Sequence, residues 1–113
     1  MLTIEVLKEY GANVQEGLTR CVNNEQFYLK LVGKALADTN YERLLAAVEK
    51  KDLDDAFEAA HALKGAWSNL ALTPLSQPVS EMTDLLRNRT DMDYSPYIET
   101  IKEKKEELEK LME

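Results

Sequence analysis

The sequence predicts an all-α protein: an antiparallel four-helix bundle with one or two additional short helices at its N-terminus. Apolar residues recur at helical spacing through most of the chain, and no strand-like alternation extends beyond a few residues. Hydrophobic residues make up 44% and charged residues 31%, with only four glycines and three prolines, a balance typical of a helix-rich globular protein. A chain of 113 residues can build one hydrophobic core, so we expect a single domain over residues 1–113.

The N-terminal segment predicts two short helices. The first is expected over residues 3–10, because Gly11 follows it in the position that favours a helix C-cap. The second follows in "NVQEGLTRC", where Asn13 serves as the N-cap and Glu16 completes a box-like arrangement.

Three longer helical segments follow. The first is capped by Asn24 and has an apolar side that consists of Phe27, Leu31, Ala35, Val32 and Leu36. The second, "NYERLLAAVEKKD", carries leucines and a valine at helical spacing. Asp52 is expected to cap the third and longest helix, over residues 53–72.

Prolines mark the remaining boundaries. Pro74 and Pro78 in "TPLSQP" predict a turn, because a proline deep in a helix breaks the backbone hydrogen bonds. A helix is expected from there to about Asn88. Ser95 and Pro96 then fit the N-cap and first position of a last helix that ends near residue 111.

Charge and targeting features exclude several function classes. The 14 basic and 21 acidic residues give a net charge of −7, which disfavours nucleic acid and anionic membranes as partners. Cys21 is the only cysteine, so the fold depends on no disulfide. The sequence shows neither a signal-peptide pattern nor an apolar run of about 18 residues, and we expect a cytoplasmic protein.

The stretch "EAAHALKGAWSNLAL", residues 58–72, holds the only histidine and the only tryptophan. With about 100° per residue, the helix has an apolar stripe and a separate flanking face. The stripe contains Ala56, Ala60, Leu63, Trp67 and Leu70. The flanking face contains His61, Lys64, Gly65 and Ser68.

This flanking face indicates a histidine that receives an anionic group. A lone histidine is most often structural. A glycine inside a helix, however, lowers the stability of the helix by about 1 kcal/mol relative to alanine, so Gly65 is unexpected there. Because Gly65 has no side chain, a partner can approach the imidazole of His61. Lys64 can then favour an anion attached to the ring. The sequence contains no second histidine that could bind zinc, no nucleophile motif around Ser68 and no P-loop.

The motif "AHALKGAWSNLAL" resembles the signature of histidine-containing phosphotransfer (HPt) domains, roughly A-H-x-L-K-G-x-x-x-x-L-G. The matching positions are Ala60, His61, Leu63, Lys64, Gly65 and Leu70. The upstream stretch "NVQEGLTRCVNNEQFYLKLVGKAL" is similar to the usual opening of the family, and the resemblance extends over residues 11–111. The sequence departs from the pattern at Ala71, where the family has glycine, and in the two prolines of "TPLSQP".

The resemblance implies a four-helix bundle that works as a phosphorelay intermediate in two-component signalling. His61 would be the phosphoacceptor, Lys64 would stabilise the phosphoryl oxygens, and Gly65 would leave room for the partner. Ser68 and Thr83 are carried over as further partner-binding residues. The implied partners are response-regulator receiver domains and a hybrid sensor histidine kinase.

The resemblance also implies that Mg²⁺ is bound only by the partner receiver, with no cofactor or metal on this chain and no kinase or hydrolase activity of its own. Two alternatives stay open at this point. The chain is an inactive pseudo-HPt module that docks on receivers without transfer, or it is a plain helical scaffold in which the motif is coincidental.

Overall fold

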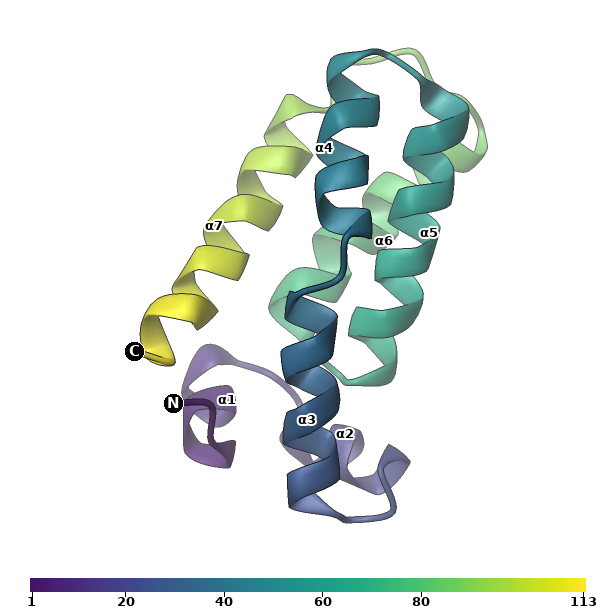
Figure 1. The fold of residues 1–113 in the computed structure, drawn as a ribbon. Helices are drawn as coiled ribbons and strands as arrows, with labels where there is room; N and C mark the ends of the chain where they lie inside the picture. The colour runs from purple at the N-terminus through teal and green to yellow at the C-terminus, as the bar shows by residue number, and fades with distance from the viewer.

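The computed structural model describes residues 1–113 and consists of α-helices and their connections, without strands (Figure 1). The helices are α1 (Ile4–Tyr10), α2 (Val14–Arg20), α3 (Glu25–Leu36), α4 (Asn40–Glu49), α5 (Leu53–Asn69), α6 (Thr73–Arg87) and α7 (Ser95–Leu111). This arrangement confirms the predicted all-α class.

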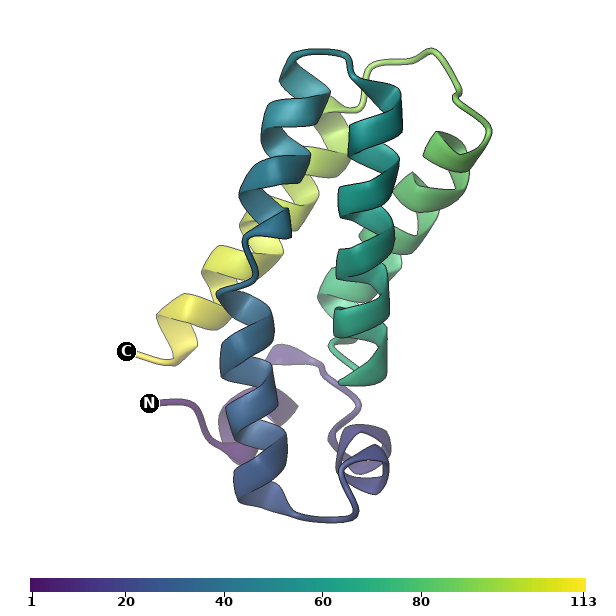
Figure 2. The same ribbon diagram turned by 45° about the vertical axis from the view of Figure 1, so that its right-hand side comes forward.

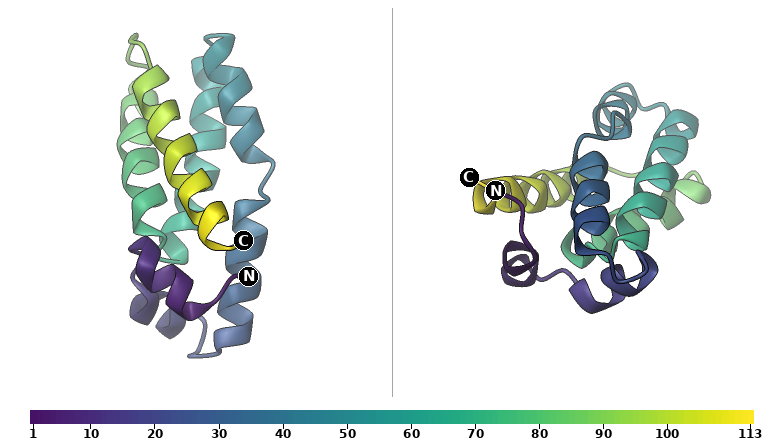
Figure 3. Two further views of the ribbon diagram at one scale, coloured as in Figure 1. Left: turned by 90° about the vertical axis from the view of Figure 1, so that its left-hand side faces the viewer. Right: turned by 60° about the horizontal axis from the view of Figure 1, so that its bottom comes forward.

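Helices α4 to α7 form the bundle, and α3 continues α4 in nearly the same direction below it (Figures 1 and 2). Helix α5 packs between α4 and α6, and α6 also packs against α7. Helices α1 and α2 lie at the end of the bundle where α5 ends (Figure 3). Helix α1 contacts α7, where the Tyr10 hydroxyl donates to the Lys104 carbonyl at 2.7 Å.

Side chains at the N-caps explain where the helices begin. Asn24 Oδ1 accepts from the Phe27 amide at 3.0 Å, and Asp52 Oδ1 accepts from the Asp55 amide at 3.1 Å. Each bond satisfies an amide that has no partner within its helix. Gly11 ends α1 with a φ of 103°, a left-handed conformation that glycine adopts without steric penalty.

The cap of α2 differs in detail from the predicted box. Asn13 Oδ1 accepts from the Glu16 amide at 3.3 Å, as expected. The Glu16 carboxylate, however, accepts from the side-chain amide of Asn13 rather than from its backbone. The Asn13 backbone N–H instead donates to the Ala71 carbonyl at 3.0 Å, which joins α2 to the end of α5.

Phe27, which was expected on the apolar side of α3, does not belong to its buried face. Phe27 is 46% exposed, and the next residue, Tyr28, is completely buried. Tyr28 takes the core position because its ring packs over Gly17, where a Cβ atom would lie 2.5 Å from the ring. Its hydroxyl also donates to the Leu70 carbonyl at 2.8 Å. The rest of the buried face agrees with the expectation and consists of Val32, Ala35 and Leu36.

The prediction of a turn through "TPLSQP" is also wrong, because α6 begins at Thr73 and contains Pro78. Pro74 lies in the first turn, where a missing N–H is tolerated. Pro78 removes only one backbone bond, and the apolar face compensates for that loss. The buried side chains of this face are Leu75, Val79, Met82 and Leu86.

Two helix ends shift slightly from their expected places. Helix α5 ends at Asn69 rather than near residue 72. Helix α7 begins at Ser95, so Tyr94 is its N-cap residue, and the Asp93 carboxylate accepts from the Ser95 amide at 2.9 Å. None of the helices is long and apolar enough to cross a lipid bilayer.

Candidate functional site

His61 lies in the middle of α5 with its side chain exposed, whereas Ala60, Leu63 and Trp67 on the same helix are completely buried. Trp67 anchors this stripe further, since its indole N–H donates to the Ala35 carbonyl of α3 at 3.3 Å. The predicted division of α5 into a core stripe and a flanking face is therefore confirmed. A rigid, packed helix carries an accessible imidazole.

The His61 ring stacks on the ring of Phe57, one turn earlier on α5, with 5.7 Å between the ring centroids and an angle of 18° between the planes. This distance lies in the range of offset aromatic stacking. The hydrogen bonds and ion pairs of the structure do not include the imidazole, so its nitrogens are free to react with a group from outside.

Lys64 follows His61 by three residues, which places it on the same side of α5. Its side chain is half-buried and takes part in none of the ion pairs of the structure. The ammonium group is therefore available to a new anion.

Gly65 is exposed, and a Cβ atom added there would meet no other atom within 4 Å. No contact inside the protein therefore requires glycine at this position. Gly17 is the opposite case, because the Tyr28 ring leaves no room for a side chain there. The absence of an internal reason at Gly65 fits the interpretation that the free space serves something outside the chain.

The other two residues expected at the site are placed differently. Ser68 is half-buried, and its carbonyl accepts from Arg20 Nη1 at 2.7 Å. Thr83 is completely buried, and its hydroxyl donates to the Val79 carbonyl at 2.6 Å. The expectation that Thr83 contacts a partner does not fit this placement, because its side chain has no exposed surface.

Arg87 and Arg89 are further neighbours of the site, and the sequence pattern does not reveal them. The Cζ atom of Arg87 lies 5.7 Å from the centroid of the Phe57 ring, and that of Arg89 lies 5.0 Å from it. Arg87 is the last residue of α6, which is antiparallel to α5, and Arg89 follows in the connection after that helix. The spacing from Phe57 to His61 was visible as an i,i+4 pair, but the arginines become neighbours only through the packing of two helices.

Comparison with protein-family models gives a match to the Hpt domain over residues 34–113. The chain belongs to the Hpt domain family. Neither the curated proteins nor the solved structures compared with it gave a match. Hpt domains take part in phosphorelay signalling and interact with receiver domains, so this chain is a component of such signalling.

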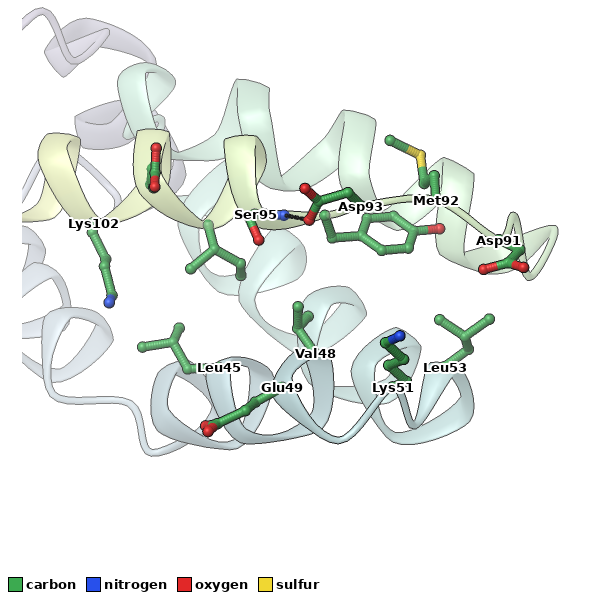
Figure 4. A pocket seen from close by; sticks show the side chains of 13 residues that line it. Leu45, Val48, Glu49, Lys51, Leu53, Asp91, Met92, Asp93, Ser95 and Lys102 are labelled. Carbon is green, nitrogen blue, oxygen red and sulfur yellow. Dashed lines mark hydrogen bonds between the residues drawn. The ribbon is translucent and has the colours of Figure 1, made fainter.

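A groove of this Hpt domain lies away from His61. It has a volume of about 880 Å³ and opens between α4 and the start of α7, as Figure 4 shows. Leu45 and Val48 line one side of the groove, and Tyr94 and Ile98 line the other. His61, Lys64 and Gly65 are not among its lining residues. The candidate site is therefore an open helix face, which suits a protein partner better than a small molecule.

No group of three or more histidine, cysteine or carboxylate side chains lies close enough together to hold a metal ion.

Proposed function

We propose that this Hpt domain is a phosphorelay intermediate in which His61 reversibly accepts a phosphoryl group. The donor is the aspartyl phosphate of a receiver domain, such as that of a hybrid sensor histidine kinase, and the acceptor is another response regulator. The observation that carries this proposal is the exposed imidazole of His61 beside Gly65, whose Cβ position faces empty space.

The transfer balances without a further reactant. The lone pair of one imidazole nitrogen forms a bond to phosphorus while the bond from phosphorus to the aspartate oxygen breaks. The bonding electrons leave with the carboxylate, and the proton on the other ring nitrogen passes to solvent. Both states are high-energy phosphates, so the reaction runs in either direction and depends mainly on positioning and charge compensation.

Lys64 is proposed to supply the charge compensation. A phosphoryl group on His61 brings negative charge to a chain whose net charge is already −7. The ammonium group of Lys64 has no carboxylate partner in the structure and can approach the phosphoryl oxygens. Ser68, one turn further along α5, is a weaker candidate for the partner-binding surface.

An inactive receiver-binding module is the alternative function. A single transfer experiment separates the two. The chain is incubated with a receiver domain carrying radiolabelled phosphate, and the label on each protein is followed by gel electrophoresis. The relay proposal expects label on the chain and none on His61→Gln. A chain that binds the receiver but takes no label supports the alternative.

Lys64→Ala and Lys64→Arg extend the experiment. We expect Lys64→Ala to slow transfer by about tenfold or more, since a charge-assisted contact contributes about 1.5–3 kcal/mol. Lys64→Arg retains the charge and should recover most of the rate. Lys34→Ala, on α3, is the matched control and should transfer at the wild-type rate.

We further propose that residues 1–113 form one domain, although the family match begins only at residue 34. Helices α1 and α2 are bonded to α7 and to the end of α5, respectively. We also propose a cytoplasmic location, because aspartyl phosphates derive from ATP.

A further inference from the structure

We propose that Phe57 is a positioning residue that orients the imidazole of His61 for phosphoryl transfer, and that Arg87 and Arg89 hold Phe57 in place. This inference rests on the proposed function of His61. It concerns how this chain fixes a reactive ring that it leaves exposed.

The stack on Phe57 is the contact that restrains the His61 ring. Functional histidines are usually oriented by a hydrogen bond to the ring nitrogen that does not react. His61 has no such bond in this structure. Elsewhere on α5, the Asp55 amide and the Trp67 indole N–H do have hydrogen-bond acceptors, and no buried side-chain N or O atom lacks a partner. The near-parallel rings, 18° apart, limit rotation of the imidazole about its side-chain bonds.

Two guanidinium groups lie over the Phe57 ring, both in the range of cation–π contact. Arg89 Nε donates to Asp54 Oδ1 at 2.6 Å, and its Nη1 donates to the Leu86 carbonyl at 2.7 Å. Arg87 Nη1 donates to Asp84 Oδ1 at 3.3 Å. These bonds fix the arginines.

The ion pairs also decide between two roles for this cluster. An arginine that served only to attract an acidic partner would gain from being unpaired, but Arg87 and Arg89 are each paired with an aspartate. Their positive charge toward a partner is therefore reduced. The geometry favours the alignment of Phe57 and His61 over long-range attraction.

Positioning and docking give different kinetics. An oriented imidazole lowers the barrier to transfer within the complex, so its loss reduces kcat and leaves KM unchanged. Loss of a docking contact raises KM instead. We expect Phe57→Leu, which keeps the apolar bulk but loses the aromatic ring, to reduce kcat by about two- to tenfold, the range of an aromatic pair. Phe57→Tyr retains the stack and should restore the rate.

The arginines provide a coupling test. Arg89→Ala should reduce kcat by about two- to fivefold, in line with a cation–π contact near the surface. In a Phe57→Leu background the same substitution should have no further effect, because it acts through the ring. Arg43→Ala is the matched control: Arg43 forms an ion pair of the same 2.6 Å length with Asp55 of α5 but does not contact Phe57. It should leave kcat unchanged.

The decisive measurement does not depend on transfer. Carbon relaxation and chemical shifts of the His61 ring are recorded by NMR in the wild type, Phe57→Leu and Phe57→Tyr. We expect faster ring motion and the loss of a ring-current shift in Phe57→Leu only. Unchanged ring motion in Phe57→Leu would overturn the inference, and so would a rise in KM with unchanged kcat. If His61 takes no label in the wild type or in any of the variants that keep it, the proposed function is overturned instead.

Discussion

The hydroxyl of Tyr28 on α3 donates a 2.8 Å hydrogen bond to the carbonyl of Leu70, which follows the last turn of α5. Arg20 bonds the Ser68 carbonyl, and the Asn13 backbone N–H bonds the Ala71 carbonyl. Carbonyls at a helix end have no partner within the helix. The N-terminal segment therefore completes the end of the helix that carries His61, even though it lies before the family match.

Tyr28→Phe tests this connection. The substitution leaves the Leu70 carbonyl without its partner while preserving the ring that packs over Gly17. We expect the free energy of unfolding to fall by about 1–3 kcal/mol, the range for an unsatisfied buried polar group. Urea denaturation followed by circular dichroism measures the change. A loss below a few tenths of a kcal/mol would show that the bond to α5 does not stabilise the fold.

The same tyrosine makes the fold sensitive to alkali. Burial, together with the nearby Cys21, raises the pKa of Tyr28 to about 12 from its ordinary value of 10.0. In the unfolded chain the phenol loses its proton first, so the free energy of unfolding falls as the pH rises from about 10 to about 12. Burial also raises the pKa of Tyr10. Urea denaturation at several pH values should show a smaller fall in the free energy of unfolding for Tyr28→Phe than for the wild type. An equal fall in both proteins would show that Tyr28 is not the cause of the alkali sensitivity.

Ala71 is the departure from the family pattern that the structure explains. It follows α5 with a φ of 56°, and the Leu72 amide bonds the Trp67 carbonyl at 3.0 Å in a Schellman arrangement. A left-handed conformation disfavours alanine by about 1 kcal/mol or more relative to glycine. We therefore expect Ala71→Gly to increase the free energy of unfolding by about 1 kcal/mol. Lys51→Gly, at an exposed position with a φ of 59°, should give a similar gain. A loss of stability in Ala71→Gly would mean that burial of the Ala71 methyl group contributes more than relief of the left-handed backbone conformation.

Gly65 and Gly33 form a matched pair, because a Cβ atom at either position meets no atom within 4 Å. Both glycines lie inside helices, so each substitution by alanine should increase the free energy of unfolding by about 0.5–1 kcal/mol. Only Gly65→Ala should slow phosphoryl transfer, because only position 65 lies beside His61. Equal transfer rates for the two variants would show that the partner does not need the space at Gly65.

The sequence was sufficient for features set by a few neighbouring residues. The caps at Asn13, Asn24 and Asp52 depend on side chains within one turn, and the structure confirms all three. The two faces of α5 follow from helical spacing alone, which explains why the exposure of His61 was predictable.

Features that depend on tertiary packing were not predictable in the same way. Phe27 and Tyr28 are both aromatic, and the choice of Tyr28 for the core depends on Gly17 and on the end of α5. Pro78 remains in α6 because the buried face of that helix outweighs one missing hydrogen bond. Arg89 reaches Phe57 because α5 and α6 are antiparallel neighbours.

The most direct test of the account is transfer of labelled phosphate from a phosphorylated receiver domain to the wild-type chain and to His61→Gln. We expect label on the wild type that is lost in acid and stable in alkali, the behaviour of phosphohistidine, and its absence from His61→Gln with an unchanged helical circular dichroism spectrum. Label that persists on His61→Gln would contradict His61 as the phosphoacceptor. A wild-type chain that binds the receiver but stays unlabelled would contradict the relay role.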